Sequence, residues 1–225
     1  MSGRLARSIV LERVADLVPG SDGSDCVRVG IDGVDGSGKT VFADELAEVL
    51  RDAGRPVVRV SVDDFHHVRA VRYRRGRDSP EGYWLDSYDY ARLRADVLEP
   101  LAPGGSRWYR RAAHDVVRDL ILNVEPVRAP PGAVLVLDGI FLHRRELAGT
   151  WDFSVFLVVP FDVTARRMAA RDGTSADPNH ASMRRYVEGQ SLYLAACAPQ
   201  QQASLVVDNT SFEAPRIIES GIAFT

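Results

Sequence analysis

The stretch Gly33-Val34-Asp35-Gly36-Ser37-Gly38-Lys39-Thr40 fits the pattern G-x-x-x-x-G-K-S/T of a phosphate-binding loop. An apolar run over residues 27–31 precedes it, and apolar residues at helical spacing over 42–53 follow. Glycines let several backbone N–H groups converge on one anion, and the start of a helix adds its positive dipole end. The stretch therefore predicts a nucleotide site whose residues are Gly33, Asp35, Gly36, Ser37, Gly38, Lys39 and Thr40.

Within this loop, Lys39 is expected to reach the β- and γ-phosphates, and the Thr40 hydroxyl is expected to bind Mg²⁺. Lys39 is also the only lysine in a chain with 28 basic residues, since all the others are arginine. The single lysine thus stands where a compact, flexible ammonium group is needed. This placement favours a functional loop over a chance match to the pattern.

The composition is that of an ordinary globular protein. The chain has 225 residues, of which 45% are hydrophobic, and a formal net charge of −3, which argues against a nucleic-acid or membrane binder. It contains two cysteines without metal-binding spacing, no apolar run long enough to span a membrane and no signal peptide, so we expect a cytoplasmic protein. Self-association into a homo-oligomer is left open.

Apolar runs alternate with helical patterns along the chain, which predicts an α/β fold with a mostly parallel central sheet flanked by helices. Further strands are expected at 57–62, 133–137, 153–159 and 205–207, and further helices at 4–18, 89–101 and 181–196. In the helix over 4–18, the buried face is expected to hold Ile9, Val10, Val14, Leu17 and Val18.

We expect one domain over residues 1–225, with three regions around its core. Residues 1–24 would form an N-terminal helix and loop. Residues 106–123 would form a β-hairpin on the acceptor side, with strands at 107–111 and 116–122 and His114-Asp115 in its turn. Residues 166–185 would form a short lid.

Acidic residues stand at or just beyond the ends of the predicted strands. Ligands of an open parallel sheet bind at the carboxyl ends of its strands, and phosphoryl transfer needs a metal-associated carboxylate and a carboxylate that accepts a proton. Asp138 fits the metal role and Asp63 fits the base, whereas Asp78 lies in the loop between them. A helix cap or a turn is the alternative reading for any one of these residues.

Two segments of the sequence are rich in arginine. Arg166, Arg167 and Arg171 lie on one predicted helix that leads into a polar segment, where they could stabilise charge on the transferred group. The other segment, over 69–77, fits a solvated loop better than a binding patch.

The order of these segments resembles the uridine–cytidine kinases, in a wider family that includes phosphoribulokinase and pantothenate kinase. The resemblance covers residues 27 to about 208. Besides the phosphate loop, it rests on Ser61-Val62-Asp63-Asp64-Phe65-His66, Asp78-Ser79-Pro80, Tyr109 to His114, Val136-Leu137-Asp138-Gly139-Ile140 and the arginine helix.

The resemblance implies roles for individual residues. Asp63 is similar to the catalytic base, Asp78 to an aspartate on the ribose or metal side, and His114 to a histidine that packs on the pyrimidine near Tyr109. Asp138 stands where the family has glutamate, and His66 replaces a tyrosine that helps to read the base. Asp86 is the other candidate for the acceptor-side aspartate. Arg166 and Arg171 resemble lid arginines with a catalytic role, and Arg167 is assigned to the nucleotide side.

These features predict a kinase that uses ATP and Mg²⁺ to phosphorylate a small-molecule hydroxyl, with the 5′-OH of uridine or cytidine as the first choice. A kinase for pantothenate or a sugar phosphate is the alternative, and ATP and GTP are not distinguished as donors. A GTP-binding switch would need an Asn-Lys-x-Asp motif, for which the chain has no second lysine. A nucleotide-binding regulator without catalysis is disfavoured by the presence of Lys39, Asp63 and Asp138.

Overall fold

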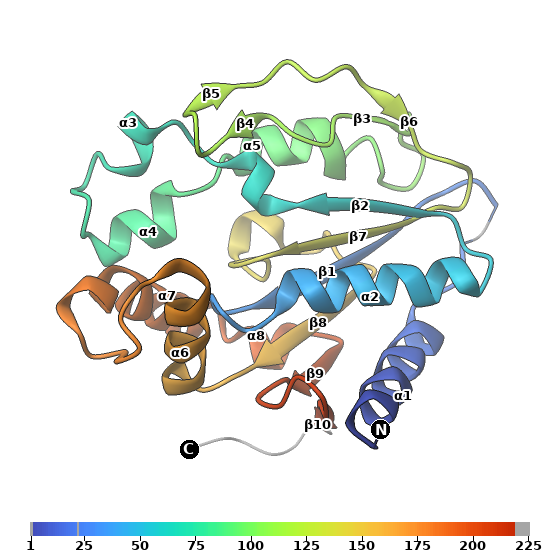
Figure 1. The fold of residues 1–225 in the computed structure, drawn as a ribbon. Coiled ribbons are helices and arrows are strands. Elements are labelled where there is room, and N and C mark those ends of the chain that lie inside the picture. Colours follow the sequence, from blue (N-terminus) through green and yellow to red (C-terminus); the bar gives the residue numbers. More distant parts are fainter. Residues whose placement is uncertain (1, 22, 219–225) are drawn as a thin grey trace.

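The computed structural model describes residues 2–21 and 23–218, which form a six-stranded sheet with helices on both sides (Figure 1). The strand order is β10-β9-β8-β1-β7-β2, and every neighbouring pair is parallel except β9 and β10. The predicted mostly parallel α/β fold is therefore confirmed. The strands are β1 (Val27–Gly33), β2 (Val57–Ser61), β7 (Val134–Gly139), β8 (Phe153–Val158), β9 (Leu205–Asp208) and β10 (Arg216–Ile218).

Two hydrophobic cores lie on opposite faces of the sheet, because successive residues of a strand point to opposite sides. On β7, Val134 and Val136 enter the core beneath α1 (Ser2–Leu17) and α2 (Lys39–Asp52), whereas Leu135 and Leu137 enter the other core. The second core is covered by α4 (Pro80–Asp86), α5 (Tyr90–Leu93), the π-helical turn η2 (Arg94–Leu98) and part of α7 (Arg184–Cys197). Burial on both faces explains why β7 does not alternate in hydropathy.

The remaining described elements are short, apart from one helix. The helices are η1 (Val62–Phe65), α3 (Arg69–Arg72), η3 (Arg145–Leu147), α6 (Phe161–Asp172), η4 (Ala181–Met183) and α8 (Pro199–Gln202). Of these, α3 lies in the segment over 69–77, for which a solvated loop was expected. The strand β10 was not predicted either, because its three residues carry too short a pattern to be distinguished from a turn.

The predicted β-hairpin over 106–123 is wrong in its pairing. β3 (Trp108–Tyr109) pairs with β6 (Val127–Arg128), and β4 (His114–Asp115) pairs with β5 (Leu120–Ile121). His114 is thus in a strand, and the turn falls at 116–119, where Asp115 accepts hydrogen bonds from the backbone N–H groups of Val117 and Arg118. The side chain of Asp115 stabilises this turn in a way that hydropathy alone does not reveal.

The N-terminal helix is present, and its predicted apolar face is correct for Val10, Val14 and Val18 but wrong for Ile9 and Leu17. Leu11, Val14 and Val18 are buried against α2, whereas Ile9 is 56% exposed and Leu17 40% exposed. The packed stripe continues through Arg7, whose guanidinium bonds Glu45 and Asn209. A charged residue at a core-facing position concealed the true register of the stripe. Residues 1 and 22, which were assigned to the N-terminal region, lie outside the described residues, as do 219–225.

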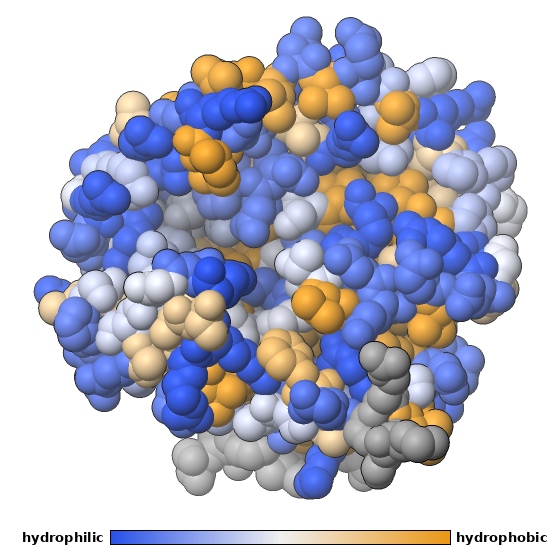
Figure 2. Space-filling view, in the orientation of Figure 1, coloured by the Kyte–Doolittle hydropathy of each residue, from blue (hydrophilic) through white to orange (hydrophobic). Residues whose placement is uncertain are grey.

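The outer surface of this view is mostly hydrophilic (Figure 2). Among the described residues, no helix is long and apolar enough to cross a lipid bilayer. Hydrophobic groups on this face are small and separated, and some lie at its upper edge over β5 and β6, where Leu120, Ile121 and Val127 are exposed.

Candidate active site

The phosphate loop joins β1 to α2 and depends on its glycines. Gly36 and Gly38 adopt φ values of +72° and +88°, which side chains rarely allow. A Cβ atom at Gly36 would lie 2.7 Å from the carbonyl oxygen of Thr164 in α6, so the loop packs closely against that helix. Lys39 is the first residue of α2, and the loop therefore presents the start of a fourteen-residue helix to the pocket.

The polar side chains of the loop contact one another and the end of β7. Lys39 Nζ donates a hydrogen bond to the carbonyl oxygen of Val34 at 2.9 Å. Thr40 Oγ1 donates to Asp138 Oδ2 at 2.7 Å, and Arg59 donates to Asp138 Oδ1 at 3.0 Å. Asp138 is 1% exposed. Both of its oxygens accept hydrogen bonds, as a buried carboxylate requires.

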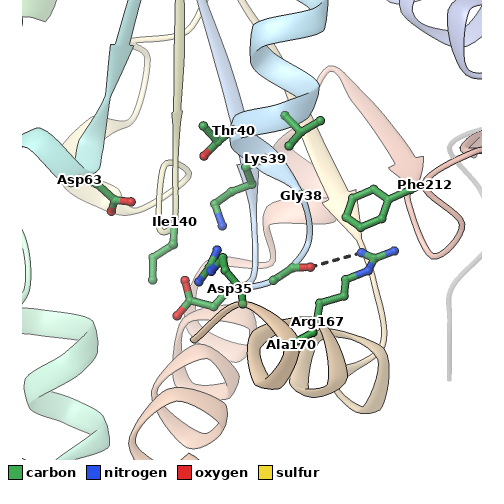
Figure 3. Close-up of a pocket in the computed structure, with 12 residues that line it drawn as sticks. Asp35, Gly38, Lys39, Thr40, Asp63, Ile140, Arg167, Ala170 and Phe212 are labelled. Carbon is green, nitrogen blue, oxygen red and sulfur yellow. Dashed lines mark hydrogen bonds between the residues drawn. The ribbon is translucent and has the colours of Figure 1, made fainter. Parts of the chain in front are cut away.

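A pocket of about 510 Å³ lies against this loop (Figure 3). In the view of Figure 3, Asp63 and Phe212 lie at its two ends, and Lys39 lies between them. The pocket thus extends from the end of β2 to the segment after β9. Its lining residues are Asp35, Gly36, Gly38, Lys39, Thr40, Val41, Asp63, Ile140, Arg167, Ala170, Arg171 and Phe212.

Asp63 is held at one end of the pocket by a tyrosine. It lies in η1, directly after β2, and its Oδ1 accepts a hydrogen bond from Tyr88 at 2.9 Å. Burial, together with the charge of Asp63, raises the pKa of Tyr88 well above its usual value of 10.0, so the tyrosine stays protonated and donates. The other oxygen of Asp63 accepts no hydrogen bond from the described residues and is open to a ligand.

The three arginines of α6 have different environments. Arg167 donates to the carbonyl oxygens of Gly36, Asn209 and Thr210, and its guanidinium lies 3.7 Å from the ring centroid of Phe212. Arg171 lines the pocket; its hydrogen bonds to Asp172 and the nearby charges of Asp35 and Asp63 raise its pKa.

Arg166 is not brought to the pocket. It is exposed and pairs with Asp162 one turn earlier on the helix, at 3.0 Å. The i,i+1 neighbours of a helix point in different directions, which is why the sequence could not separate Arg166 from Arg167. Arg184 and Arg185, at the end of the segment 166–185 that was expected to form the lid, are also absent from the pocket lining. Arg184 pairs with Glu188, and Arg185 donates to the carbonyl oxygen of Arg77.

The residues expected on the acceptor side are only partly gathered near Asp63. His66 Nδ1 is 2.7 Å from the carbonyl oxygen of Asp63, and its ring lies 4.3 Å from that of Tyr88. Burial lowers the pKa of His66, which favours the neutral ring. Tyr109 is half-buried in β3, and Asp78 is exposed in the turn before α4, where Ser79 caps the helix.

His114 is 3% exposed, and neither of its ring nitrogens has a hydrogen-bond partner among the described residues. Its Nε2 lies 3.2 Å from Asp119 Oδ1, which is instead bonded by the backbone N–H of Arg69. A buried imidazole without partners carries a desolvation penalty that a ligand could relieve. His114 therefore remains a candidate for contact with a polar ligand.

Asp86 has a structural partner set. It is 1% exposed, and its two oxygens accept hydrogen bonds from Arg74 and from Arg75, the latter at 2.9 Å. The arginine run over 69–77 thus supplies at least two side chains that hold this run to the end of α4. These contacts leave Asp86 without a free oxygen for an acceptor.

We expect Asp86→Asn to lower the free energy of unfolding by about 1.5–3 kcal/mol, because it removes two charge-assisted hydrogen bonds. Although burial opposes it, the two arginines lower the pKa of Asp86 below its usual value of 3.8. A carboxylate whose pKa is lowered by folding stabilises the folded state at pH values above its unfolded-state pKa. This stabilisation is lost as the pH falls through the folded-state pKa. The difference between wild type and variant in urea unfolding should therefore be full at pH 7 and shrink below about pH 4. A loss that is equal at pH 7 and pH 3 would contradict this assignment.

Several residues of the site were missed in the sequence. Tyr83 and Tyr88 bond Asp35 and Asp63, and Asn209 Nδ2 donates to the carbonyl oxygen of Ser37 at 2.7 Å. Phe212 closes the far end of the pocket. Asn209 follows a buried strand and could have been found by the strand-end argument, whereas the tyrosines carry no sequence pattern that separates them from core aromatics.

The site suits a magnesium–nucleotide complex. Among the described residues, no group of three or more His, Cys, Asp or Glu side chains could hold a metal alone. Mg²⁺ usually keeps several waters and binds one or two protein ligands together with substrate phosphates. The Thr40–Asp138 pair beside the glycine loop offers that donor set.

The loop, the strand order and the carboxylates together define a P-loop phosphotransferase. A family model described as the phosphoribulokinase / uridine kinase family matches residues 28–210, and the chain belongs to this family of kinases that act on a hydroxyl group. The chain is 28% identical over 197 residues to a uridine kinase from Shewanella halifaxensis, covering 81% of this chain and 87% of that protein. It is 30% identical over 163 residues to a uridine kinase from Shewanella pealeana, covering 66% of this chain and 70% of that protein.

Two solved structures share the fold. A possible uridine kinase from Bacillus stearothermophilus has a TM-score of 0.70 and 23% identity, with 92% of this chain and 99% of that chain covered. A candidate fructose transport system kinase from Silicibacter sp. TM1040 has a TM-score of 0.62, also at 23% identity, with 88% and 95% covered. At these identities the structures support the fold and leave the acceptor to the chemistry of the pocket.

Proposed function

We propose that this kinase uses ATP and Mg²⁺ to phosphorylate the 5′-OH of uridine or cytidine. The observation that carries the proposal is that one pocket joins the phosphate loop to Asp63, a carboxylate with an open oxygen. The two relatives named uridine kinase add support for the acceptor. The proposal assigns the Phe212 end of the pocket to the nucleotide and the Asp63 end to the acceptor.

On the donor side, the loop N–H groups and Lys39 would hold the phosphates of ATP. Among the described residues, Lys39 Nζ has only the carbonyl oxygen of Val34 as a partner, so a phosphate oxygen can replace it without breaking an ion pair. Thr40 and Asp138 would hold Mg²⁺, which supplies charge neutralisation on the phosphates when bound. The hydrogen bond from Arg59 fixes Oδ1 of Asp138 and so orients Oδ2 toward Thr40.

On the acceptor side, Asp63 would accept the proton of the attacking hydroxyl. The hydrogen bond from Tyr88 fixes the carboxylate and leaves its other oxygen for the substrate. Arg171 lines the same pocket and offers a positive charge to the transferred group. A carboxylate and a cation that share one pocket with the phosphate loop support this division of roles.

A kinase for an anionic acceptor, such as a sugar phosphate, is the other candidate from the sequence. It would need free cations near Asp63, and the arginine run over 69–77 is the segment of the sequence that could supply them. Arg74 and Arg75 are instead bonded to Asp86, and Arg72 is 3.5 Å from Asp119. These pairings favour the nucleoside over the sugar phosphate.

The pyrimidine assignment is tested through His114. We expect His114→Ala to raise KM for uridine roughly 5- to 150-fold, because a buried hydrogen bond contributes about 1–3 kcal/mol. The preference for uridine over a purine nucleoside should fall in parallel. Initial rates with uridine and adenosine as acceptors measure both effects. An unchanged KM for uridine, with the variant still folded, would remove His114 from the acceptor site.

The adjacent arginines of α6 provide a matched pair of variants. We expect Arg167→Ala to raise KM for ATP on the order of 10-fold, because it breaks the charged hydrogen bonds that hold Gly36 to the segment after β9. Arg166→Ala removes the same side chain from an exposed surface and should stay close to wild type. Initial rates at varied ATP concentration give KM for both variants. An equal rise in KM for ATP in Arg166→Ala and Arg167→Ala would contradict the different roles assigned to the two arginines.

A further inference from the structure

Asp35 belongs to the phosphate loop, but its contacts differ from those of a phosphate ligand. Its backbone N–H donates to the side-chain oxygen of Gln190 in α7 rather than pointing at the space over the loop. Gln190 is 2% exposed and is itself held by the carbonyl oxygen of Tyr186. The N–H of Asp35 is therefore already committed to a buried partner.

The side chain of Asp35 is fixed in the same manner as that of Asp63. Its Oδ2 accepts a hydrogen bond from Tyr83, a residue that is 7% exposed and packs edge-on against Phe141 and Tyr186. Burial, together with the charge of Asp35, raises the pKa of Tyr83 well above its usual value, so Tyr83 is a donor. The other oxygen of Asp35 accepts no hydrogen bond in the part of the chain that the structure describes.

Both carboxylates line one pocket, and Arg171 lies within reach of their charges. Each has one oxygen held by a buried tyrosine and one oxygen that no described residue occupies. The other cations of the pocket lining are Lys39, which belongs to the phosphate loop, and Arg167, which is bonded to backbone carbonyl oxygens. Each of the two carboxylates would repel a phosphate and would accept hydrogen bonds from hydroxyl groups.

We propose that Asp35 is a specificity residue for the acceptor, and that its open oxygen accepts a hydrogen bond from a second hydroxyl of a neutral polyol while Asp63 accepts the proton of the reacting one. The inference rests on the proposed kinase activity and narrows its acceptor. For a nucleoside, the second hydroxyl is the 2′- or 3′-OH of the ribose. A phosphorylated or carboxylated acceptor would instead place its negative charge beside the two carboxylates, which disfavours it.

The test compares Asp35→Asn and Tyr83→Phe with Glu48→Gln, which removes an exposed carboxylate from the outer side of α2. KM is measured for uridine at saturating ATP and for ATP at saturating uridine. We expect Asp35→Asn to raise KM for uridine roughly 10- to 100-fold and to leave KM for ATP within a few-fold, since a hydrogen bond to a charged group is lost. Tyr83→Phe should move KM in the same direction by less, and Glu48→Gln should match wild type.

A second comparison uses 2′-deoxyuridine and 3′-deoxyuridine. For the analogue that lacks the bound hydroxyl, the KM of wild type should rise to the KM that Asp35→Asn shows for uridine. The KM of Asp35→Asn should be no higher for this analogue than for uridine. Losses that simply add for both analogues, or a rise in KM for ATP as large as that for uridine, would overturn the proposal.

Failure of the nucleoside assignment gives a different result. In that case wild type would use another acceptor from a panel of sugars, pantothenate and sugar phosphates, and the same two KM values are measured with that acceptor. A neutral polyol whose KM responds to Asp35→Asn would support the role of Asp35 without the nucleoside. A preference of wild type for a phosphorylated acceptor would overturn it.

Discussion

Replacing Lys39 with alanine should lower kcat on the order of 10³-fold or more, the scale of losing a preorganised charge at the transferred phosphate. Lys39 is the only lysine of the chain, and its Nζ contacts a loop carbonyl oxygen, with no acidic partner among the described residues. The ammonium group is therefore available to the substrate. Acceptor-dependent release of ADP measures the loss.

Two controls separate charge from fold and from shape. The circular dichroism melting curve of Lys39→Ala should stay close to that of wild type, because the side chain belongs to none of the hydrophobic clusters formed by the described residues. Lys39→Arg keeps the charge but replaces a compact ammonium with a planar fork, and it should also be severely impaired. Turnover near the wild-type rate in the arginine variant would refute the role assigned to Lys39.

Asp63→Asn should lower kcat by about 10²- to 10⁴-fold, the range for removal of a general base. The substitution preserves the size of the side chain and the hydrogen bond that Tyr88 can donate, so the effect isolates the proton acceptor. KM for ATP should change little, because Asp63 lies at the end of the pocket away from Phe212. Rapid-quench and steady-state rates with the same acceptor measure the change.

The adjacent Asp64 is the matched control for Asp63. Its carboxylate lines a separate polar pocket with Arg59 and Arg111, and burial together with the charge of Asp63 raises its pKa. Asp64→Asn should therefore cost only a few-fold in kcat. If Asp63→Asn weakened ATP binding and spared kcat, Asp63 would belong to the nucleotide side instead.

The donor half of the site could be predicted from the sequence because its chemistry is local. A glycine loop between a strand and a helix requires a specific run of residues, and Asp138 follows from the rule that ligands bind at strand ends. The same rule located Asp63. A strand that is buried on both faces is apolar along its length, so the end of the apolar run marks the end of the strand.

The acceptor half could not be predicted in the same way, since it depends on contacts between distant segments. Tyr83 and Tyr88 come from a segment, 78–88, for which no helix or strand was predicted. Arg74 and Arg75, from the run expected to be solvated, instead bond Asp86. The pairing of β4 with β5 was missed because two-residue strands carry almost no pattern. Arg166 and Arg167 show that adjacent residues of one helix can have different partners: Arg166 pairs with Asp162 on the surface, whereas Arg167 lines the pocket.

The most direct test of the proposed uridine kinase activity is the product formed by the wild-type enzyme from ATP, Mg²⁺ and uridine. ³¹P NMR distinguishes a nucleoside 5′-phosphate from inorganic phosphate and from phosphorylation at another hydroxyl. We expect uridine 5′-phosphate together with an equal amount of ADP, and no ADP when uridine or Mg²⁺ is left out. ADP that accumulates at the same rate without any acceptor, or a phosphate found only on a sugar phosphate supplied in place of uridine, would contradict the proposed activity.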